Sequence, residues 1–179
     1  MALPMFESEI GEILIDEHEI QDKIRELAKN ITEDYLDKDL LLVGVLKGAF
    51  LLMSDLAREI KLPLEFDFMA VSSYGSTTKT SGVVRILKDL DYEITDRNVL
   101  LVEDIIDSGL TLNYLLKYLR ARRPASLEVC ALLRKDGIQQ VDTHVRYEGF
   151  VIPPKFVIGY GLDYNQRHRN LPYVALLKE

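Results

Sequence analysis

The sequence has a single cysteine, no long apolar run and no excess of basic residues. Cys130 cannot form an intrachain disulfide, and its place in the apolar run Leu127–Leu133 indicates a buried, unreactive thiol. No apolar run approaches the roughly 20 residues that a membrane-spanning helix needs, and the first residues lack the basic flank of a secretory signal. The net charge of −7 and the scattered basic residues argue against a nucleic-acid-binding face. We therefore expect a cytoplasmic protein that binds neither membranes nor nucleic acids.

Two common nucleotide-binding motifs are also missing. The sequence contains no G-x-x-x-x-G-K-[ST] phosphate loop and no G-x-G-x-x-G after a strand-like segment. His18, His144 and His168 are far apart and lack the spacing of metal ligands. These absences argue against a phosphate-loop NTPase, a Rossmann dinucleotide site and a histidine-based metal centre. They do not exclude a small anionic substrate, because a metal ion and backbone amides can neutralise phosphate locally.

Segments with a helical spacing of apolar residues alternate with short apolar runs that are typical of buried strands. The helical segments are residues 16–36, 49–60 and 111–122, and the strand-like segments are residues 40–46, 64–72, 83–87, 98–102, 127–133 and 156–159. This alternation predicts one α/β domain over residues 1–179, with a mostly parallel sheet flanked by helices. In open sheets of that kind, ligands bind beyond the carboxyl ends of the strands.

The most informative segment is Val99–Thr111, with the sequence VLLVEDIIDSGLT. Two adjacent acids, Glu103 and Asp104, end the apolar run, and Asp107 and a Ser-Gly pair precede the next helix. Glycine lets the backbone turn tightly and approach a ligand, and the free N–H groups of a helix start bind phosphate. Carboxylates can accept hydrogen bonds from vicinal hydroxyls or face a hard cation. Acids and serines after a strand are also common as helix caps, so it is the complete string, not any one residue, that favours a ligand site.

Val99–Thr111 closely resembles the phosphoribosyl pyrophosphate motif of type I phosphoribosyltransferases. Four further stretches, residues 43–56, 67–91, 132–135 and 153–174, resemble hypoxanthine phosphoribosyltransferases and occur in that family's order. The resemblance implies the type I phosphoribosyltransferase fold, an α/β fold with a mostly parallel central sheet. It also implies a mobile lid loop at about 73–82, and a small hood formed by the N-terminal segment and about 136–179.

The implied activity is purine salvage. Such an enzyme transfers the 5-phosphoribosyl group from phosphoribosyl pyrophosphate to N9 of hypoxanthine, and also of guanine, giving IMP or GMP and pyrophosphate. The resemblance implies Mg²⁺ as cofactor and a homodimer or homotetramer. Two alternatives stay open: a noncatalytic regulator on the same fold, and a transferase for xanthine or another base.

The resemblance assigns a role to each matching residue. Asp107 is the catalytic acid or base near purine N7, a role that contributes about 10²–10⁴-fold to a rate. The metal-side acids are Glu103, Asp104 and Asp163. The substrate-binding residues are Lys47, Gly48, Ser73, Tyr74, Glu103, Asp104, Ser108, Gly109, Leu110, Thr111, Lys135, Phe156, Val157 and Arg169.

Among these, Glu103 and Asp104 hold the ribose hydroxyls, and the loop Asp107–Thr111 holds the 5′-phosphate. Ser73 and Tyr74 close the lid over the reaction centre, where water would compete with the base. The small, polar composition of that loop indicates mobility by itself, although an idle surface loop has the same composition.

Other roles concern the base and the pyrophosphate. Lys135 reads the 6-oxo group, Phe156 stacks on the purine, and Val157 contacts the base through its backbone. Lys47, after a cis peptide bond to Leu46, and Arg169 bind pyrophosphate. Judged by local sequence alone, Lys47 is part of a helix-entry turn, Lys135 is an ordinary turn lysine and Phe156 is a core residue.

One departure from the family pattern follows Lys135. Many bacterial relatives carry Asp-Lys-Pro here, whereas this chain has Arg134-Lys135-Asp136-Gly137. The lysine is retained, but we expect a different turn after it.

Overall fold

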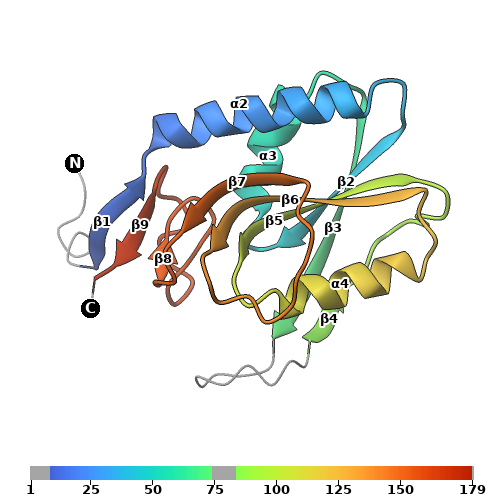
Figure 1. The fold of residues 1–179 in the computed structure, drawn as a ribbon. Helices are drawn as coiled ribbons and strands as arrows, with labels where there is room; N and C mark the ends of the chain where they lie inside the picture. Colours follow the sequence, from blue (N-terminus) through green and yellow to red (C-terminus); the bar gives the residue numbers. More distant parts are fainter. Residues whose placement is uncertain (1–8, 74–83, 179) are drawn as a thin grey trace.

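The computed structural model describes residues 9–73 and 84–178 of the 179-residue chain. In this part of the chain, helices cover both faces of a six-stranded sheet, and a smaller sheet stands to one side (Figure 1). In spatial order the main sheet consists of β4 (Val84–Lys88), β3 (Leu64–Ser73), β2 (Leu40–Leu46), β5 (Asn98–Ile106), β6 (Ser126–Lys135) and β7 (Tyr147–Ile152). Only the edge pair of β3 and β4 is antiparallel. The expected α/β fold with a mostly parallel sheet is confirmed.

Helices α2 (Glu17–Asp34) and α3 (Phe50–Glu59) cover one face of this sheet, and α4 (Leu110–Arg120) covers the other (Figure 1). Each helix buries an apolar stripe, which divides the core into one cluster under α2 and α3 and a second under α4. The N-terminus of α2 is fixed by a capping box, in which Asp16 and Glu19 each accept a hydrogen bond from the other's backbone N–H. The central strands are therefore buried on both faces, as their uninterrupted apolar runs indicate.

The two chain ends meet in the smaller sheet. β1 (Ile10–Ile15) pairs with β9 (Val174–Leu177), which pairs with β8 (Val157–Ile158), and both pairs are antiparallel. Figure 1 shows this sheet beside the carboxyl-terminal part of the main sheet's strands. The range expected to form the hood, about 136–179, also contains β7. That strand instead extends the main sheet, because it pairs in parallel with β6 from Cys130↔Tyr147 to Lys135↔Ile152.

Several boundaries differ from the sequence expectation. β5 continues through Ile106 rather than ending at Val102, because residues from Glu103 to Ile106 keep pairing with β6. The expected lid falls mostly outside the described residues: Ser73 is the last residue of β3, whereas Tyr74 and residues 75–82 are not described. Within the described residues, no helix combines the length and apolar character needed to cross a membrane.

Candidate active site

The carboxyl end of β5 forms the wall of a cavity of about 190 Å³. Its lining comes from β2, β3, β5 and the start of α4, where the sequence placed a ligand. The lining residues are Val45, Val71, Glu103, Asp104, Ile105, Ile106, Asp107, Ser108, Gly109, Thr111 and Leu112. The structure therefore brings all three acids of the Val99–Thr111 segment to one cavity.

Glu103 and Asp104, the two adjacent acids of this cavity, lie at buried positions where ionisation of a carboxyl group is unfavourable. Glu103 is 7% exposed, and burial, with the neighbouring Asp104 charge, raises the pKa of its carboxyl well above the usual value. Burial also raises the pKa of Asp104, to about 6. This rise is partly offset by the backbone N–H of Ile105, which donates to Asp104 Oδ1 at 2.8 Å, and by the positive charge of Arg169. A ligand that donates hydroxyl hydrogens or brings positive charge would relieve this cost.

The turn between β5 and α4 has the geometry of an anion site. Gly109 is the N-cap of α4 and has a left-handed backbone with φ 79°, a conformation that favours glycine. A Cβ there would lie 3.2 Å from the carbonyl oxygen of Val141, so the glycine also lets a second segment pack closely behind the turn. The first N–H groups of the helix have no carbonyl partner within the helix itself, and they begin next to the Ser108 hydroxyl. This arrangement suits a phosphate group.

Asp107 and Lys135 meet across the ends of two neighbouring strands. Lys135 Nζ lies 3.0 Å from Asp107 Oδ2, and the lysine side chain is 13% exposed whereas that of Asp107 is 58% exposed. The carboxylate therefore faces solvent at the cavity, and the ammonium approaches it from β6. The two residues that the resemblance assigned to purine N7 and O6 lie side by side.

Lys47 and Gly48 follow β2, and Gly48 lies against Asp104 of β5. The Leu46–Lys47 peptide bond is cis, as the resemblance implied. A Cβ on Gly48 would overlap the carboxylate of Asp104, and a Cβ on Gly161 would overlap the carbonyl oxygen of Gly48. The Gly48 backbone is thus packed between β5 and the segment after β8.

That segment after β8 carries a network of polar side chains. Arg169 contacts Asp163 Oδ1 at 2.7 Å and donates to the carbonyl oxygen of Gly161 at 2.6 Å. Gln166 Oε1 accepts from Lys47 Nζ at 3.2 Å and from Arg169 at 3.4 Å. Positive side chains from two distant parts of the sequence therefore converge beside Asp104. The sequence reasoning did not identify Gln166, since a lone glutamine in a loop gives no signal.

Phe156 lies just before β8, and Val157 is the first residue of β8 in the smaller sheet. The Phe156 ring is 54% exposed and makes an edge-on contact with Tyr164 at a centroid distance of 6.0 Å, whereas Val157 is buried. An exposed aromatic ring is not a core residue, which contradicts the local reading of this phenylalanine. An open ring face suits stacking on a planar ligand.

The side chains of the described residues form no complete metal centre by themselves. Among residues 9–73 and 84–178, no group of three or more His, Cys, Asp or Glu side chains is arranged to hold a metal ion. Mg²⁺ is commonly held by one or two carboxylates together with water and substrate phosphates. The oxygen donors of Asp104 and Asp163 at this edge fit a cation of that kind.

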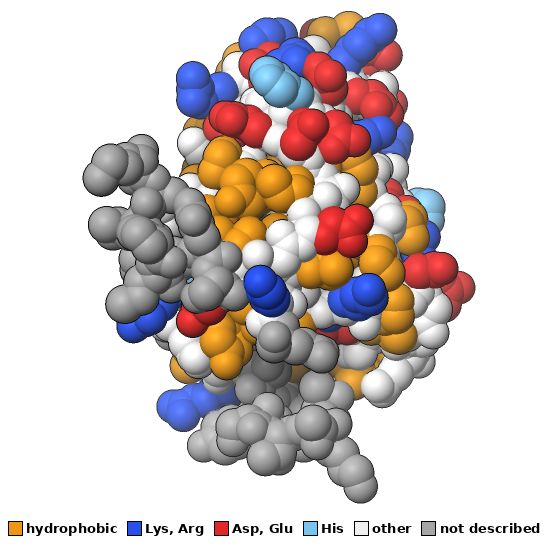
Figure 2. Space-filling view, turned by 90° about the vertical axis from the view of Figure 1, so that its left-hand side faces the viewer, with side chains coloured by type: hydrophobic (Ala, Val, Ile, Leu, Met, Phe, Trp, Pro, Cys, Tyr) orange, Lys and Arg blue, Asp and Glu red, His pale blue; other side chains and the backbone are white. Residues whose placement is uncertain are grey.

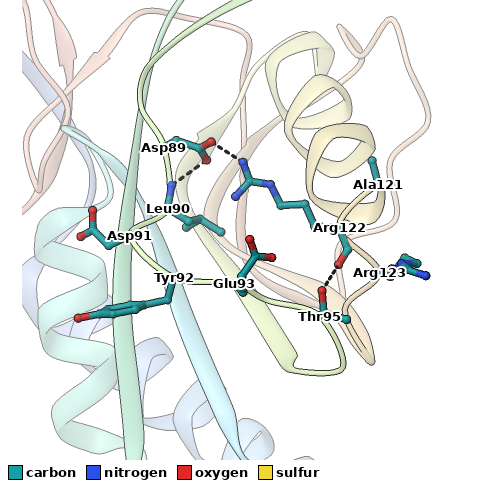
Figure 3. Close-up of a pocket in the computed structure, with 9 residues that line it drawn as sticks. All are labelled: Asp89, Leu90, Asp91, Tyr92, Glu93, Thr95, Ala121, Arg122 and Arg123. Atoms are coloured by element: carbon teal, nitrogen blue, oxygen red, sulfur yellow. Dashed lines mark hydrogen bonds and ion pairs between the residues drawn. The ribbon is translucent and has the colours of Figure 1, made fainter.

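A larger cavity, of about 530 Å³, lies at the opposite end of β5 (Figure 3). In it Arg122 contacts the Asp89 carboxylate, and Thr95 Oγ1 donates to the Arg122 carbonyl oxygen at 3.1 Å. The cavity lies between the β4–β5 connection and the end of α4. None of the residues predicted for the active site lines it, so its greater size does not make it the active site.

The charges on the hood side of the molecule are mixed. Figure 2 shows basic side chains scattered among acidic ones on this face, with no continuous basic area among the residues it colours. The mixture of signs on this face is consistent with the net charge of −7.

Comparison with known proteins agrees with this geometry. The family model described as "Phosphoribosyl transferase domain" matches residues 11–165. The hypoxanthine-guanine phosphoribosyltransferase of Mycobacterium avium is 51% identical, over 97% of this chain and 88% of that protein. That of Bacillus subtilis is 48% identical, over 97% of both chains. A solved structure of a hypoxanthine phosphoribosyltransferase from Staphylococcus aureus has a TM-score of 0.94 and 42% identity, covering 99% of this chain and 97% of that chain. The chain therefore belongs to the phosphoribosyltransferase family, in its hypoxanthine-guanine phosphoribosyltransferase branch.

Proposed function

We propose that this protein transfers the 5-phosphoribosyl group of phosphoribosyl pyrophosphate to N9 of hypoxanthine and guanine, releasing pyrophosphate. The observation that carries the choice of base is the Asp107–Lys135 pair, with 3.0 Å between carboxylate and ammonium beside the anion-binding turn. The family membership supports the transfer reaction itself. Its relatives are named as enzymes, so nothing favours a noncatalytic regulator.

The two charges of this pair are complementary to one edge of a 6-oxopurine. On that edge an imidazole N–H at N7 and a carbonyl oxygen at O6 are neighbours, so a carboxylate and an ammonium side by side meet a donor and an acceptor. Adenine presents an amino group in place of O6, and a lysine cannot donate to it. A buried polar group left unpaired by the wrong ligand is a strong source of discrimination.

The sugar phosphate fits the adjacent features of the same cavity. The turn Asp107–Thr111 supplies backbone and hydroxyl donors for the 5′-phosphate. Glu103 and Asp104 accept hydrogen bonds from the ribose hydroxyls, which offsets the cost of their burial. Lys47 and Arg169, which share the Gln166 side chain, lie on the side proposed for pyrophosphate.

The hood and the lid complete the proposed site. Phe156 stacks on the purine, and the backbone of Val157 contacts the base. Ser73, at the end of β3, and Tyr74 are proposed to close over the reaction centre. The whole of residues 1–179 then acts as one domain, with the lid at about 73–82.

A divalent cation completes the charge balance. Family membership indicates a divalent metal in general, and we propose Mg²⁺, held by Asp104, Asp163 and the substrate, with Glu103 nearby. When bound, the cation would supply positive charge that offsets the negative charge developing on the pyrophosphate. A homodimer or homotetramer stays a prediction from the resemblance, and a cytoplasmic location stays a prediction from the sequence.

The reaction is a displacement at C1′ of the ribose. N9 of the purine forms the new bond as the bond from C1′ to the pyrophosphate oxygen breaks, and the leaving pyrophosphate takes the electron pair. Asp107 accepts the proton from N7 of the base. Lys47 and Arg169 bind the leaving group, and the enclosing hood and lid keep water from attacking the cationic C1′.

Removing the lysine tests the assignment of the base. We expect Lys135→Ala to lower kcat/KM for hypoxanthine by about 10- to 100-fold, since it removes a charged hydrogen bond to O6. The KM for phosphoribosyl pyrophosphate should stay within about twofold of the wild-type value.

Equal rates with hypoxanthine, guanine, xanthine and adenine in the wild type would refute the assignment, and a preference for xanthine would favour the alternative substrate.

A further inference from the structure

Gln139 connects the two residues that face the purine edge. Its side-chain Nε2 donates to the backbone carbonyl oxygen of Asp107 at 3.2 Å, and it also donates to the backbone carbonyl oxygen of Lys135. Asp107 follows the end of β5 and Lys135 ends β6, so one amide group spans the ends of two strands. The backbone pairing of β5 and β6 ends at Ile106↔Arg134, so the Gln139 amide links the two strands just beyond their last backbone pair.

The turn after Lys135 brings Gln139 back to this position. Gly137 has a left-handed backbone with φ 69°, and Asp136 donates its N–H to the carbonyl oxygen of Ile152 at 2.8 Å. The chain thus stays on the sheet for one residue beyond β6 and then reverses. The next residue, Gln140, donates its backbone N–H to the carbonyl oxygen of Ser108 at 2.9 Å. The Asp-Gly sequence that departs from the family pattern therefore returns the chain against the phosphate turn.

We propose that Gln139 is a positioning residue that fixes the spacing between the Asp107 carboxylate and the Lys135 ammonium, and so helps to select the 6-oxopurine. This proposal rests on the proposed roles of Asp107 and Lys135. Gln139 is partly buried and both of these hydrogen bonds go to backbone atoms, so it acts through the two residues and not on the base. Small errors in the placement of reacting groups cost large factors in rate, which makes such spacing worth fixing.

The two contacts use only the donor half of the amide. Both partners are carbonyl oxygens, so a carboxylate of the same shape would face two acceptors and repel them. Gln139→Glu therefore removes the donor while it keeps the side-chain volume. Gln139→Ala removes donor and volume together but leaves the carbonyl oxygens free to bind water. A donor role predicts that Glu is the more harmful substitution, whereas a packing role predicts that Ala is.

The test measures KM and kcat for hypoxanthine and for phosphoribosyl pyrophosphate separately. We expect Gln139→Glu to raise the KM for hypoxanthine about 10-fold and Gln139→Ala to raise it about 3-fold, consistent with the loss of one or two hydrogen bonds. The KM for phosphoribosyl pyrophosphate should stay within about twofold. Gln140→Ala is the matched control, because it removes an amide of the same size at the next, exposed side chain, adds no charge beside the phosphate turn, and should leave both KM values unchanged.

Three results would overturn the proposal. They are wild-type KM for hypoxanthine in both Gln139 variants, a larger effect of Ala than of Glu, and an equal rise in the two KM values. The thermal midpoint of each variant establishes that it is folded, and if Gln139→Glu does not fold, the Ala variant is compared with Gln140→Ala by the same criteria. If the wild-type protein transfers no phosphoribosyl group to any 6-oxopurine, the proposed function fails, a result distinct from failure of the Gln139 role.

Discussion

At the scale of single residues, the site depends on charged groups that are placed before any substrate arrives. Asp107 is held beside Lys135 at 3.0 Å, yet more than half of its side chain is exposed. A carboxylate in that position can accept a proton from a ligand in the cavity without a change in the backbone. The alternative, in which Asp107 is only a helix-capping residue, does not fit, because Gly109 is the N-cap of α4.

Substitution of Asp107 by asparagine tests its role in proton transfer. Asn has nearly the same shape but cannot accept a proton, so we expect kcat to fall about 10²- to 10⁴-fold. Binding of phosphoribosyl pyrophosphate, measured by calorimetry, should change little, because the phosphate turn beside it is unaltered. An unchanged kcat would remove Asp107 from the acid-base role.

Gly48 gives a prediction about stability. Because a Cβ at this position would overlap the Asp104 carboxylate, we expect Gly48→Ala to lower the free energy of unfolding by about 1–3 kcal/mol, as overpacked sites do. Urea denaturation measures this change. A double-mutant cycle is the control: in an Asp104→Ala background the overlapping group is absent, so the cost of Gly48→Ala should shrink. The same cost in both backgrounds would show that the overlap is not its cause.

At the scale of the elements, two buried carboxyl groups at the carboxyl end of β5 make the free energy of unfolding depend on pH. The pKa of Asp104 is raised from 3.8 to about 6, so between about pH 4 and pH 6 the folded state binds more protons than the unfolded state. The free energy of unfolding therefore falls as the pH rises through that window, and Glu103, with its pKa also raised, acts in the same direction. A group with a raised carboxyl pKa thus destabilises the fold once it is ionised.

Replacing Asp104 by asparagine should remove its part of this dependence. We expect Asp104→Asn to be more stable, relative to the wild type, at pH 7.5 than at pH 4, with activity lost because the ribose hydroxyls lose an acceptor. Urea denaturation of both proteins at the two pH values measures the difference. Comparison with the wild type cancels other groups, such as Asp34, whose lowered pKa acts in the opposite direction. An equal difference at both pH values would contradict a buried, costly carboxylate.

The helices and strands also show which structural features can be predicted from a sequence pattern. The apolar run Leu40–Leu46 predicted β2 with its observed bounds, and the helical spacing of residues 16–36 predicted α2, because both patterns record burial directly. The strands β1, β7 and β9 were not predicted. β7 has a short, mixed sequence in which only the two end residues are buried, and β1 and β9 acquire their partners only when the chain ends meet. Long-range pairing of that kind leaves no local signal.

The features of the candidate active site likewise fall into those that the sequence predicted and those that it did not. The acids and the turn of Val99–Thr111 lie in one continuous segment, so their common cavity followed from the sequence. Contacts between distant segments, such as Lys47 with Gln166 and Gln139 with Asp107, depend on the fold and were not predicted. The role of Lys135 came from the family resemblance, since a lysine before Asp-Gly has by itself the signature of a turn.

At the scale of the whole molecule, the fold brings three separate stretches of chain to one edge of a sheet. The segment after β2 contributes Lys47 and Gly48, β5 and the turn after it contribute the acids and the phosphate turn, and the segment after β8 contributes Asp163 and Arg169. In the proposed function, anionic sugar phosphate, cation and base meet at the carboxyl ends of parallel strands, where open α/β sheets bind ligands. Because the protein side chains alone form no complete metal site in the described residues, we expect chelation of divalent cations to abolish transfer without unfolding the protein.

Circular dichroism with and without EDTA, next to an activity assay, checks this expectation. Full activity in EDTA would show that no cation is needed, and loss of the folded signal would show that a cation has a structural role instead.

The most direct test of the proposed function is a panel of bases assayed with phosphoribosyl pyrophosphate and Mg²⁺, in which nucleotide and pyrophosphate are both measured. We expect equal amounts of nucleoside 5′-monophosphate and pyrophosphate with hypoxanthine and guanine, and no nucleotide with adenine. Formation of nucleotide from adenine as readily as from hypoxanthine, or no product from any 6-oxopurine, would contradict it.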